Sequence, residues 1–185
     1  MNQPVFGLLL FIFLITPPVA HLMESIMIIH MHMQMPMLVI AGFFMGKFVL
    51  GSFPSFFEKW NYNGVPGIIL FVIIIVYWML PRTMDEALGL LSVELFKFIS
   101  LPFLAGIPLR DSWKKLSSTW KNTIIISFTV MFAGLGLLYI ISPVQLCNNY
   151  LLIEQITLGW GFITTGVGLG IYLIYDAIVD RSEYE

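Results

Sequence analysis

Six long apolar stretches constrain the fold of this chain more than any other feature of its sequence. They cover residues 5–20, 22–50, 65–80, 88–109, 123–142 and 150–178, and short polar segments separate them. A helix needs about 20 apolar residues to cross the hydrocarbon core of a bilayer. Because these stretches are continuous rather than alternating, they predict helices and not the strands of a barrel. The sequence therefore predicts an all-α, polytopic transmembrane helix bundle with about six spans, in a single domain over residues 1–185.

The composition leads to the same class of protein. Hydrophobic residues make up 58% of the chain and charged residues 11%, whereas soluble domains are typically about 25% charged. Nine basic and eleven acidic side chains are too few to cover a soluble surface of this size. The net charge of −2 offers no nucleic-acid surface, and no nucleotide-binding loop or catalytic motif is present, so we expect neither a nucleic-acid partner nor an enzyme. The lipid bilayer is the expected environment.

The break between the first two predicted helices rests on Pro17-Pro18, which removes two backbone donors. The first stretch also permits a second interpretation as a signal peptide, with Pro18-Val19-Ala20 as a poor cleavage site. It lacks the basic segment that signal peptides carry at their start. We therefore favour a helix that is retained in the protein.

The basic residues predict the orientation of the bundle. With six spans, one side of the membrane receives seven of them: Lys47, Lys59, Arg110, Lys114, Lys115, Lys121 and Arg181. The other side receives only Arg82. Cytoplasmic loops of membrane proteins carry an excess of lysine and arginine. Both termini are therefore predicted to be cytoplasmic, and the opposite ends of the helices are external.

Methionine and histidine gather on the second predicted helix. Six of the eleven methionines lie between Met23 and Met37, and all three histidines are His21, His30 and His32. Thioether sulfur and imidazole suit copper, especially Cu(I). The methionines at 23, 27, 31 and 35 recur every fourth residue, so that on a regular helix they form one stripe. Such a stripe is also common in helix packing, because methionine fills irregular interfaces. A bis-histidine haem between two helices is excluded, since every histidine lies on one short stretch.

Several polar residues elsewhere have simpler interpretations. Glu94 and Lys97 are one turn apart and predict an internal ion pair. Asp85 lies at the start of a helix or in a short interfacial turn, and Cys147 is a free thiol or a soft ligand at the outer face. The alternation that ends at Pro36 leaves open a local unwinding of the helix, which would bring the two histidines of that segment to one side.

The order of several segments resembles the CtaG family of membrane factors for cytochrome c oxidase assembly. The similar segments are the Met-rich helix with Pro36 and Gly42, Trp78–Pro81, Met84–Leu88, Phe103–Gly106, Phe132–Pro143 and Glu154–Trp160. The chain departs from the family at its histidines. Met79 replaces one, Phe98-Ile99 replace a Glu-His pair, and Glu24 and Ile28 stand where paired histidines are expected. The family also usually has one more span.

The resemblance implies two functions. The first is the handling of copper on the external side of a prokaryotic plasma membrane, for the assembly or support of a copper enzyme such as a terminal oxidase. Its candidate metal ligands are His21, Glu24, His30, Met31, His32, Met35, Met79, Asp85 and Cys147. The alternative is an accessory subunit without a cofactor, in a respiratory oxidase or a copper membrane monooxygenase. Either function predicts other membrane subunits as partners.

Overall fold

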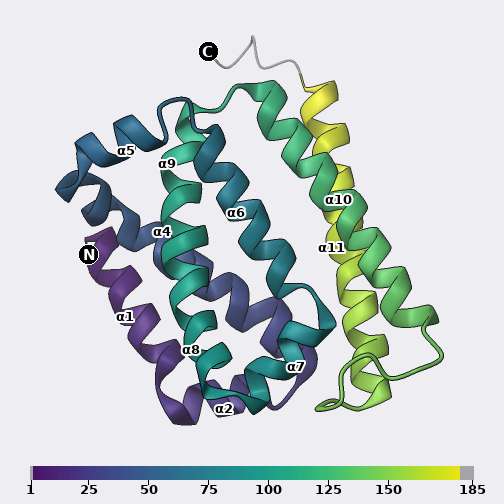
Figure 1. Ribbon diagram of the computed structural model, residues 1–185. Helices are drawn as coiled ribbons and strands as arrows, with labels where there is room; N and C mark the ends of the chain where they lie inside the picture. The colour runs from purple at the N-terminus through teal and green to yellow at the C-terminus, as the bar shows by residue number, and fades with distance from the viewer. Residues whose placement is uncertain (1, 180–185) are drawn as a thin grey trace.

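The computed structural model describes residues 2–179, and every regular element in this range is a helix (Figure 1). In chain order these are α1 (Gln3–Ile15), α2 (Pro17–Glu24), α3 (Met27–Ile29), the π-helical η1 (His30–Gln34), α4 (Met35–Ser52), α5 (Pro54–Trp60), α6 (Val65–Trp78), α7 (Pro81–Gly89), α8 (Leu91–Ile99), the π-helical η2 (Ser100–Gly106), α9 (Ile107–Lys115), α10 (Ser118–Ile141) and α11 (Leu152–Ile178). The predicted all-helical bundle is confirmed.

Four of the described helical segments are long and apolar enough to cross a membrane. They are Met27–Ser52, Leu91–Lys115, Ser118–Ile141 and Leu152–Ile178. Two further pairs pass the same test together but are bent, α1 with α2 by 70° and α5 with α6 by 86°. The described chain thus holds four candidate spans, or up to six if each bent pair is one span. A multi-pass membrane protein is supported, and the count of six stays a prediction.

The helix boundaries differ from the predicted ones where the chain becomes extended between helices. Thr16 is extended, and Pro17 then begins α2 rather than only ending α1. The expected helix at 22–50 starts later, at Met27, because Ile26 is extended. The expected helix at 88–109 is interrupted in the same way at Leu90, which separates the short helix α7 from α8. Pro54 begins an additional helix, α5, which the sequence did not predict.

The two π-helical turns share one cause. Each is followed, after one residue, by a proline: Pro36 after η1 and Pro108 after η2. A proline inside a helix clashes with the carbonyl four residues earlier. The wider π turn relieves this clash, and the residue before each proline donates its N–H five residues back, Met35 to the carbonyl of His30 and Ile107 to that of Pro102. The expected unwinding before Pro36 is therefore a widened turn, and the helix continues.

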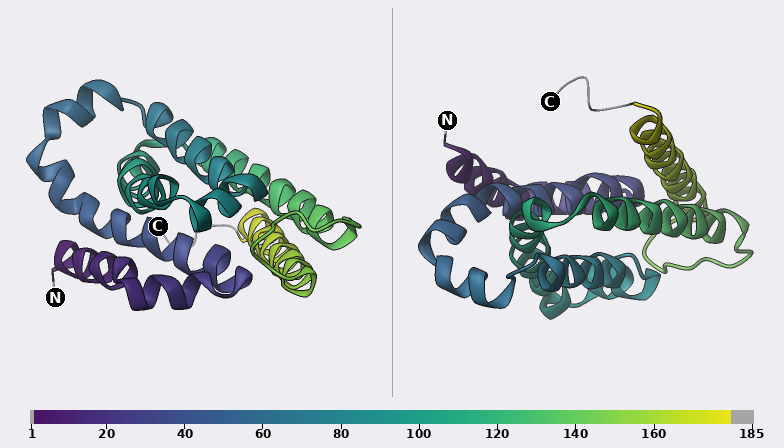
Figure 2. Two further views of the ribbon diagram at one scale, coloured as in Figure 1. Left: turned by 60° about the horizontal axis from the view of Figure 1, so that its bottom comes forward. Right: turned by 90° about the horizontal axis from the view of Figure 1, so that it is seen from above.

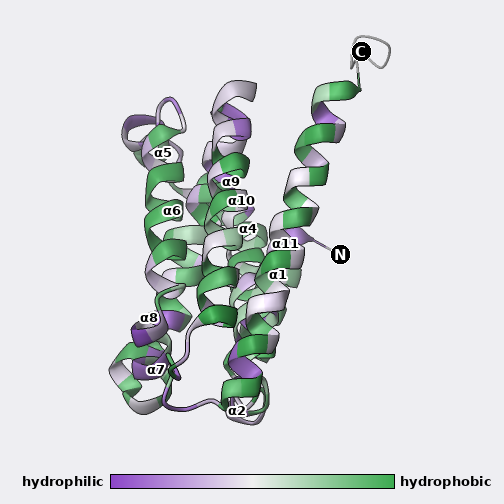
Figure 3. Cartoon of the chain, turned by 90° about the vertical axis from the view of Figure 1, so that its right-hand side faces the viewer, coloured by the Kyte–Doolittle hydropathy of each residue, from purple (hydrophilic) through white to green (hydrophobic). Residues whose placement is uncertain are grey.

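The helices have two distinct ends. The α2 end of the bundle carries α2, α7 and the loop between α10 and α11, whereas the opposite, α5 end carries α5 and the turn between α9 and α10 (Figure 1). Hydrophilic residues concentrate at these two ends, and hydrophobic residues dominate the helices between them (Figure 3). This is the distribution expected of a bundle whose middle lies in lipid.

The bundle packs as a larger body and a two-helix hairpin. In the larger body, α4 crosses η2 so closely that a Cβ on Gly42 would lie 1.9 Å from the carbonyl oxygen of Pro102. Small residues permit such close approach of helices in membranes. Helices α10 and α11 pack mainly against each other and stand at one edge of the molecule (Figure 2). The boundary between the two parts contains a cleft that is described below.

Candidate functional site

A buried ion pair lies near the α2 end of the bundle. Lys97, on α8, is fully buried, and its Nζ donates to Oε1 of Glu24, on α2, at 2.5 Å. The same Nζ lies 3.3 Å from Nε2 of His30, on η1. Lys97 therefore pairs with Glu24 and not with Glu94, the partner that its sequence neighbourhood predicted. The ammonium group occupies the space between a carboxylate and an imidazole.

Tyr150 closes this arrangement into a ring. Its hydroxyl donates to the backbone carbonyl of Glu24 at 2.7 Å and lies 2.8 Å from Nδ1 of His30. Burial raises the pKa of Tyr150, so the hydroxyl keeps its proton and acts as a donor. Since that proton points to Glu24, Nδ1 of His30 must donate to the tyrosine oxygen, which leaves Nε2 as the acceptor for Lys97. We call Glu24, His30, Lys97 and Tyr150 the polar ring.

Two neighbouring side chains add further contacts to the polar ring. Nε2 of Gln34, one turn after His30, donates to Glu24 Oε1 at 3.3 Å. The ammonium of Lys97 also lies 4.6 Å from the centre of the Phe98 ring. Buried charges in a membrane helix are normally paired and hydrogen-bonded in this way. Both nitrogens of His30 and one carboxylate oxygen of Glu24 are thus occupied by the protein itself.

The other two histidines lie apart from this ring. His32 faces α11, where its Nε2 lies 3.2 Å from the hydroxyl of Thr165 and its ring packs against Phe162 with 4.9 Å between the centres. His21 is exposed on α2 and makes no hydrogen bond or ion pair with any described residue. The widened turn therefore does not bring His30 and His32 to one side, since one turns inward and the other toward α11.

Asp85 organises the loop between α10 and α11. From α7 its carboxylate accepts the backbone N–H groups of Asn148 and Asn149 at 2.9 and 3.1 Å, and their side-chain amides at 2.6 and 2.9 Å. Partial burial raises the pKa of Asp85, but these hydrogen bonds outweigh that effect and hold the pKa below its ordinary value. The carboxylate is a structural acceptor, and its oxygens are already engaged.

Cys147 lies beside this contact as a free, buried thiol. Its thiol donates to the carbonyl of Pro81 over 3.7 Å. Burial, with a smaller contribution from the negative charge of Asp85, raises the pKa of Cys147 to about 11. Because the thiolate is the nucleophile and the metal ligand, this cysteine is a poor candidate for either role at neutral pH.

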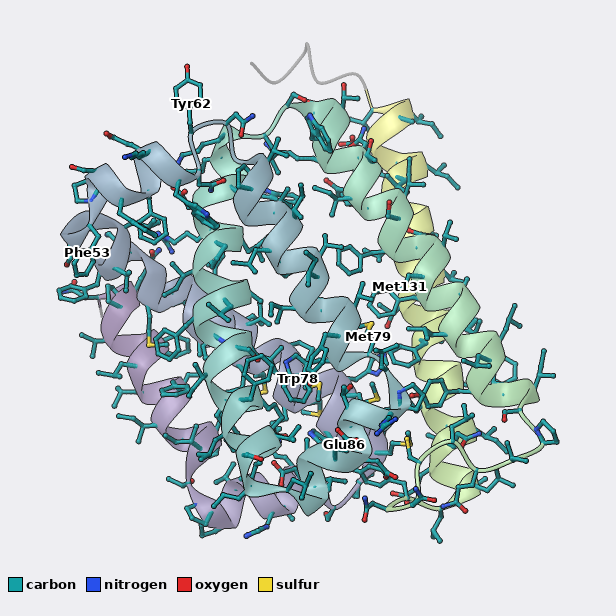
Figure 4. All side chains as sticks on the ribbon, in the orientation of Figure 1. Phe53, Tyr62, Trp78, Met79, Glu86 and Met131 are labelled. Atoms are coloured by element: carbon teal, nitrogen blue, oxygen red, sulfur yellow. The ribbon has the colours of Figure 1, made fainter. Side chains whose placement is uncertain are left out.

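Three of the predicted methionine ligands line one cavity, which we call the methionine cleft. Its volume is about 410 Å³, and it lies between the α10–α11 hairpin and the larger body. Met31 and Met35 border it from η1 and α4, and Met79 borders it from the end of α6. Figure 4 shows Met79 and Trp78 in the lower middle of the bundle, where several sulfur atoms gather. The remaining lining residues are Pro36, Val39, Ile40, Phe71, Ile75, Trp78, Leu101, Leu109, Trp113, Ile124, Ile125, Phe128, Phe132 and Leu169.

The nine predicted metal ligands thus fall into separate places. Residues 2–179 contain no group of three or more histidine, cysteine or acidic side chains that could hold a metal ion. Glu24 and His30 are joined through Lys97 and Tyr150, and Asp85 lies near enough to Cys147 for its charge to raise the pKa of the thiol. Of the nine, only Met31, Met35 and Met79 line a shared cavity. The nitrogen, oxygen and thiol candidates among the described residues do not converge on one point.

Comparison of the chain with protein-family models, with curated proteins and with solved structures finds no match. The site is thus defined by this chain's own residues. Sequence reasoning missed Tyr150 as a part of the polar ring and Gln34 as its hydrogen-bonding neighbour, and it gave Lys97 the wrong partner. A charge inside an apolar helix was a usable signal for Lys97. Tyr150 offered none, because aromatic residues are common at helix ends in membranes.

Proposed function

We propose that this chain is a CtaG-like membrane protein that binds and releases Cu(I) as cargo, with Met31, Met35 and Met79 as its ligands. The observation that supports this proposal is that three methionine residues, from η1, α4 and the end of α6, line the same cleft. Soft thioether ligands select Cu(I) over harder cations. The resemblance to a family associated with oxidase assembly provides the context in which such cargo would be delivered.

The proposed chemistry is ligand exchange, and no covalent step is needed. Three of the nitrogen and oxygen candidates are held by the protein: His30 and Glu24 by Lys97, and Asp85 by the adjacent loop. Neutral thioethers, in contrast, bind Cu(I) without losing a proton, and they accept no hydrogen bond that the metal would have to replace. This favours a site whose affinity allows both capture and release. His21, His32 and Cys147 are not part of the proposed site.

The orientation of the protein belongs to the same proposal. The basic residues Lys59, Lys114 and Lys115 lie at the α5 end of the bundle, with Lys121 just beyond them on α10. By the positive-inside tendency this end faces the cytoplasm of a prokaryotic cell, and the α2 end faces outward. Arg181, which also entered the predicted orientation, lies outside the described residues.

Anaerobic titration with Cu(I) against a Cu(I)-specific chelator tests the proposal. The purified protein should take up one Cu(I), and the triple variant Met31→Leu/Met35→Leu/Met79→Leu should lose it. The matched control is Met33→Leu/Met37→Leu/Met131→Leu, which changes three methionines outside the lining of the cleft. Equal retention of copper by the two triple variants, or no uptake by the unmodified protein, would refute the proposed site.

A second function is favoured by the position of Lys97. Its ammonium fills the space between Glu24 and His30, where a divalent cation would otherwise find two ligands. This observation supports an accessory subunit that has no metal site and serves as a scaffold in a respiratory oxidase or a copper membrane monooxygenase. Purification in mild detergent from the native membrane distinguishes the two functions. A stoichiometric partner that stays bound with and without copper, together with no Cu(I) uptake, would favour the accessory subunit.

A further inference from the structure

The methionine cleft continues far beyond its three sulfur atoms. From Met79 it extends along η2 and α9 to Trp113 near the α5 end, and α10 forms its opposite wall through Ile124 and Phe128. The helical path from Leu101 to Trp113 corresponds to a length of roughly 18 Å at about 1.5 Å per residue. This is about half of a hydrocarbon core that is typically about 30 Å thick. The cleft therefore has the depth of roughly one leaflet.

The walls of the cleft are apolar along this length. Its lining consists of aliphatic, aromatic and methionine side chains, apart from the indole N–H groups of Trp78 and Trp113. The N–H of Trp78 donates to Ser100 at 2.8 Å and is already satisfied. An apolar void of about 410 Å³ is unfavourable if empty, and water finds no partners there. A hydrocarbon chain would fill the void and needs no hydrogen-bond partners there.

The end of the cleft at Trp113 is basic. Lys121 lies with its Nζ 5.7 Å from the centre of the Trp113 ring, and Lys114 is exposed on the last turn of α9. Neither lysine forms a salt bridge with a described residue, whereas the neighbouring Lys115 is paired with Asp111 at 2.8 Å. Tryptophan and lysine in this arrangement are typical of the level of the lipid head groups.

We propose that the cleft binds one acyl chain of an anionic phospholipid, with the phosphate at Lys114 and Lys121. The acyl chain of the lipid enters sideways from the bilayer between α6 and α10, and the two lysines select a negatively charged head group. Basic pockets between membrane helices recognise anionic lipids through the same combination of charge and apolar contact. This inference goes beyond copper handling and does not depend on it, because the head group lies at the opposite end of the cleft from Met31 and Met79.

Quenching of tryptophan fluorescence by brominated lipids tests this site. The variant Trp60→Phe/Trp120→Phe/Trp160→Phe retains only the two tryptophans of the cleft, Trp78 and Trp113. In phosphatidylcholine vesicles, a small fraction of phosphatidylglycerol with brominated chains should quench it more strongly than the same fraction of brominated phosphatidylcholine. Each lysine should contribute about fivefold to this preference. All measurements are made with a copper chelator present, so that their outcome is separate from the test of copper binding.

Two further variants, each made in that background, locate the lipid. Lys114→Gln/Lys121→Gln should remove the preference for the anionic lipid, and the matched control Lys47→Gln/Lys59→Gln should retain it. Leu169→Phe, which fills the cleft from α11, should weaken quenching by both lipids. Equal quenching by the two brominated lipids in the parent variant would mean ordinary surrounding lipid only and would overturn the proposal. So would a preference that survives Lys114→Gln/Lys121→Gln.

Discussion

The polar ring and the methionine cleft lie on two sides of the same π-helical turn. The ring places paired charges in the interior of the bundle, whereas the cleft places apolar side chains around open volume. On one side of η1, His30 and Gln34 join a network in which Lys97 is paired with Glu24 and both nitrogens of His30 have partners. On the other side, Met31 and the following Met35 border open volume. The first region has fixed partners, and the second has none that a ligand must displace.

This difference indicates where exchange with a ligand is feasible. A ligand that entered the polar ring would have to replace an ion pair and leave buried charges unmatched, which is strongly unfavourable. A ligand that enters the cleft displaces only apolar contacts or lipid. The buried polar ring is therefore a structural anchor, whereas the apolar cleft is the proposed binding site.

Removal of the buried ammonium should have the largest effect on stability. Lys97→Met leaves the Glu24 carboxylate as an uncompensated buried charge, and breaking a buried pair in this way costs about 3–5 kcal/mol. The free energy of unfolding, measured by titration with sodium dodecyl sulfate in mixed micelles, should fall by that amount. Glu24→Gln/Lys97→Met removes both charges and should recover most of the loss, and Lys47→Met, at an exposed position, should be neutral. A stable Lys97→Met protein would show that the ring is not an anchor.

Loss of one hydroxyl should weaken the polar ring less. Tyr150→Phe leaves Nδ1 of His30 and the carbonyl of Glu24 without their partner, and an unsatisfied buried group costs about 1–3 kcal/mol. The same unfolding measurement should detect this change. The exposed Tyr62 provides the control, since Tyr62→Phe removes a hydroxyl that contacts solvent. If both variants unfold alike, the closing hydrogen bond of the ring does not contribute to stability.

The contact between Asp85 and the α10–α11 loop should show a dependence on pH. Because the pKa of Asp85 is lowered in the folded protein, its contribution is fully present above the ordinary pKa of aspartate. It is lost as the pH falls through the lowered value. Asp85→Asn should cost about 1 kcal/mol at neutral pH. The difference in unfolding free energy between the two proteins should disappear in acid, and a constant difference would contradict this assignment.

The smallest effect on stability is expected for a substitution on the side of η1 that borders the methionine cleft. Met35→Leu exchanges two apolar side chains of similar volume, and such exchanges usually cost less than about 1.5 kcal/mol. Its unfolding free energy should lie close to that of the unmodified protein, even though its affinity for Cu(I) should fall. A loss as large as that of Lys97→Met would mean that the methionine is a packing element, and the contrast between the two regions would fail.

Much of the bundle could be predicted because the composition and length of each apolar stretch determine its helical structure without reference to distant parts of the chain. Lipid forces each apolar stretch to be helical whatever it packs against, so the helices followed from the sequence alone. Pro36 likewise predicted an irregular turn in the helix. The bend between α5 and α6 was not predictable, because the length and hydrophobicity of a segment do not show whether it forms one straight span or two helices at an angle.

The polar ring could not be predicted, because it depends on which helices become neighbours. Glu24 and Lys97 are separated by 73 positions, and the nearer Glu94 was an equally reasonable partner from spacing alone. The methionine cleft was predicted in part, since Met31 and Met35 follow the helical repeat. That Met79 joins them from another helix follows only from the three-dimensional packing.

The π turn at residues 30–34 accommodates one residue without redirecting the helix. A π turn holds one more residue than the α-helical turn it replaces, while the rotation about the helix axis stays close to that of the α-helical turn. Deletion of a single residue within it would therefore restore a regular helix and leave the preceding residues facing nearly the same way relative to α4. In an uninterrupted α-helix the same deletion would turn them by about 100°. At this position one codon can be lost while the side chains before it keep their direction, so the π turn marks a place where the length of the helix can vary.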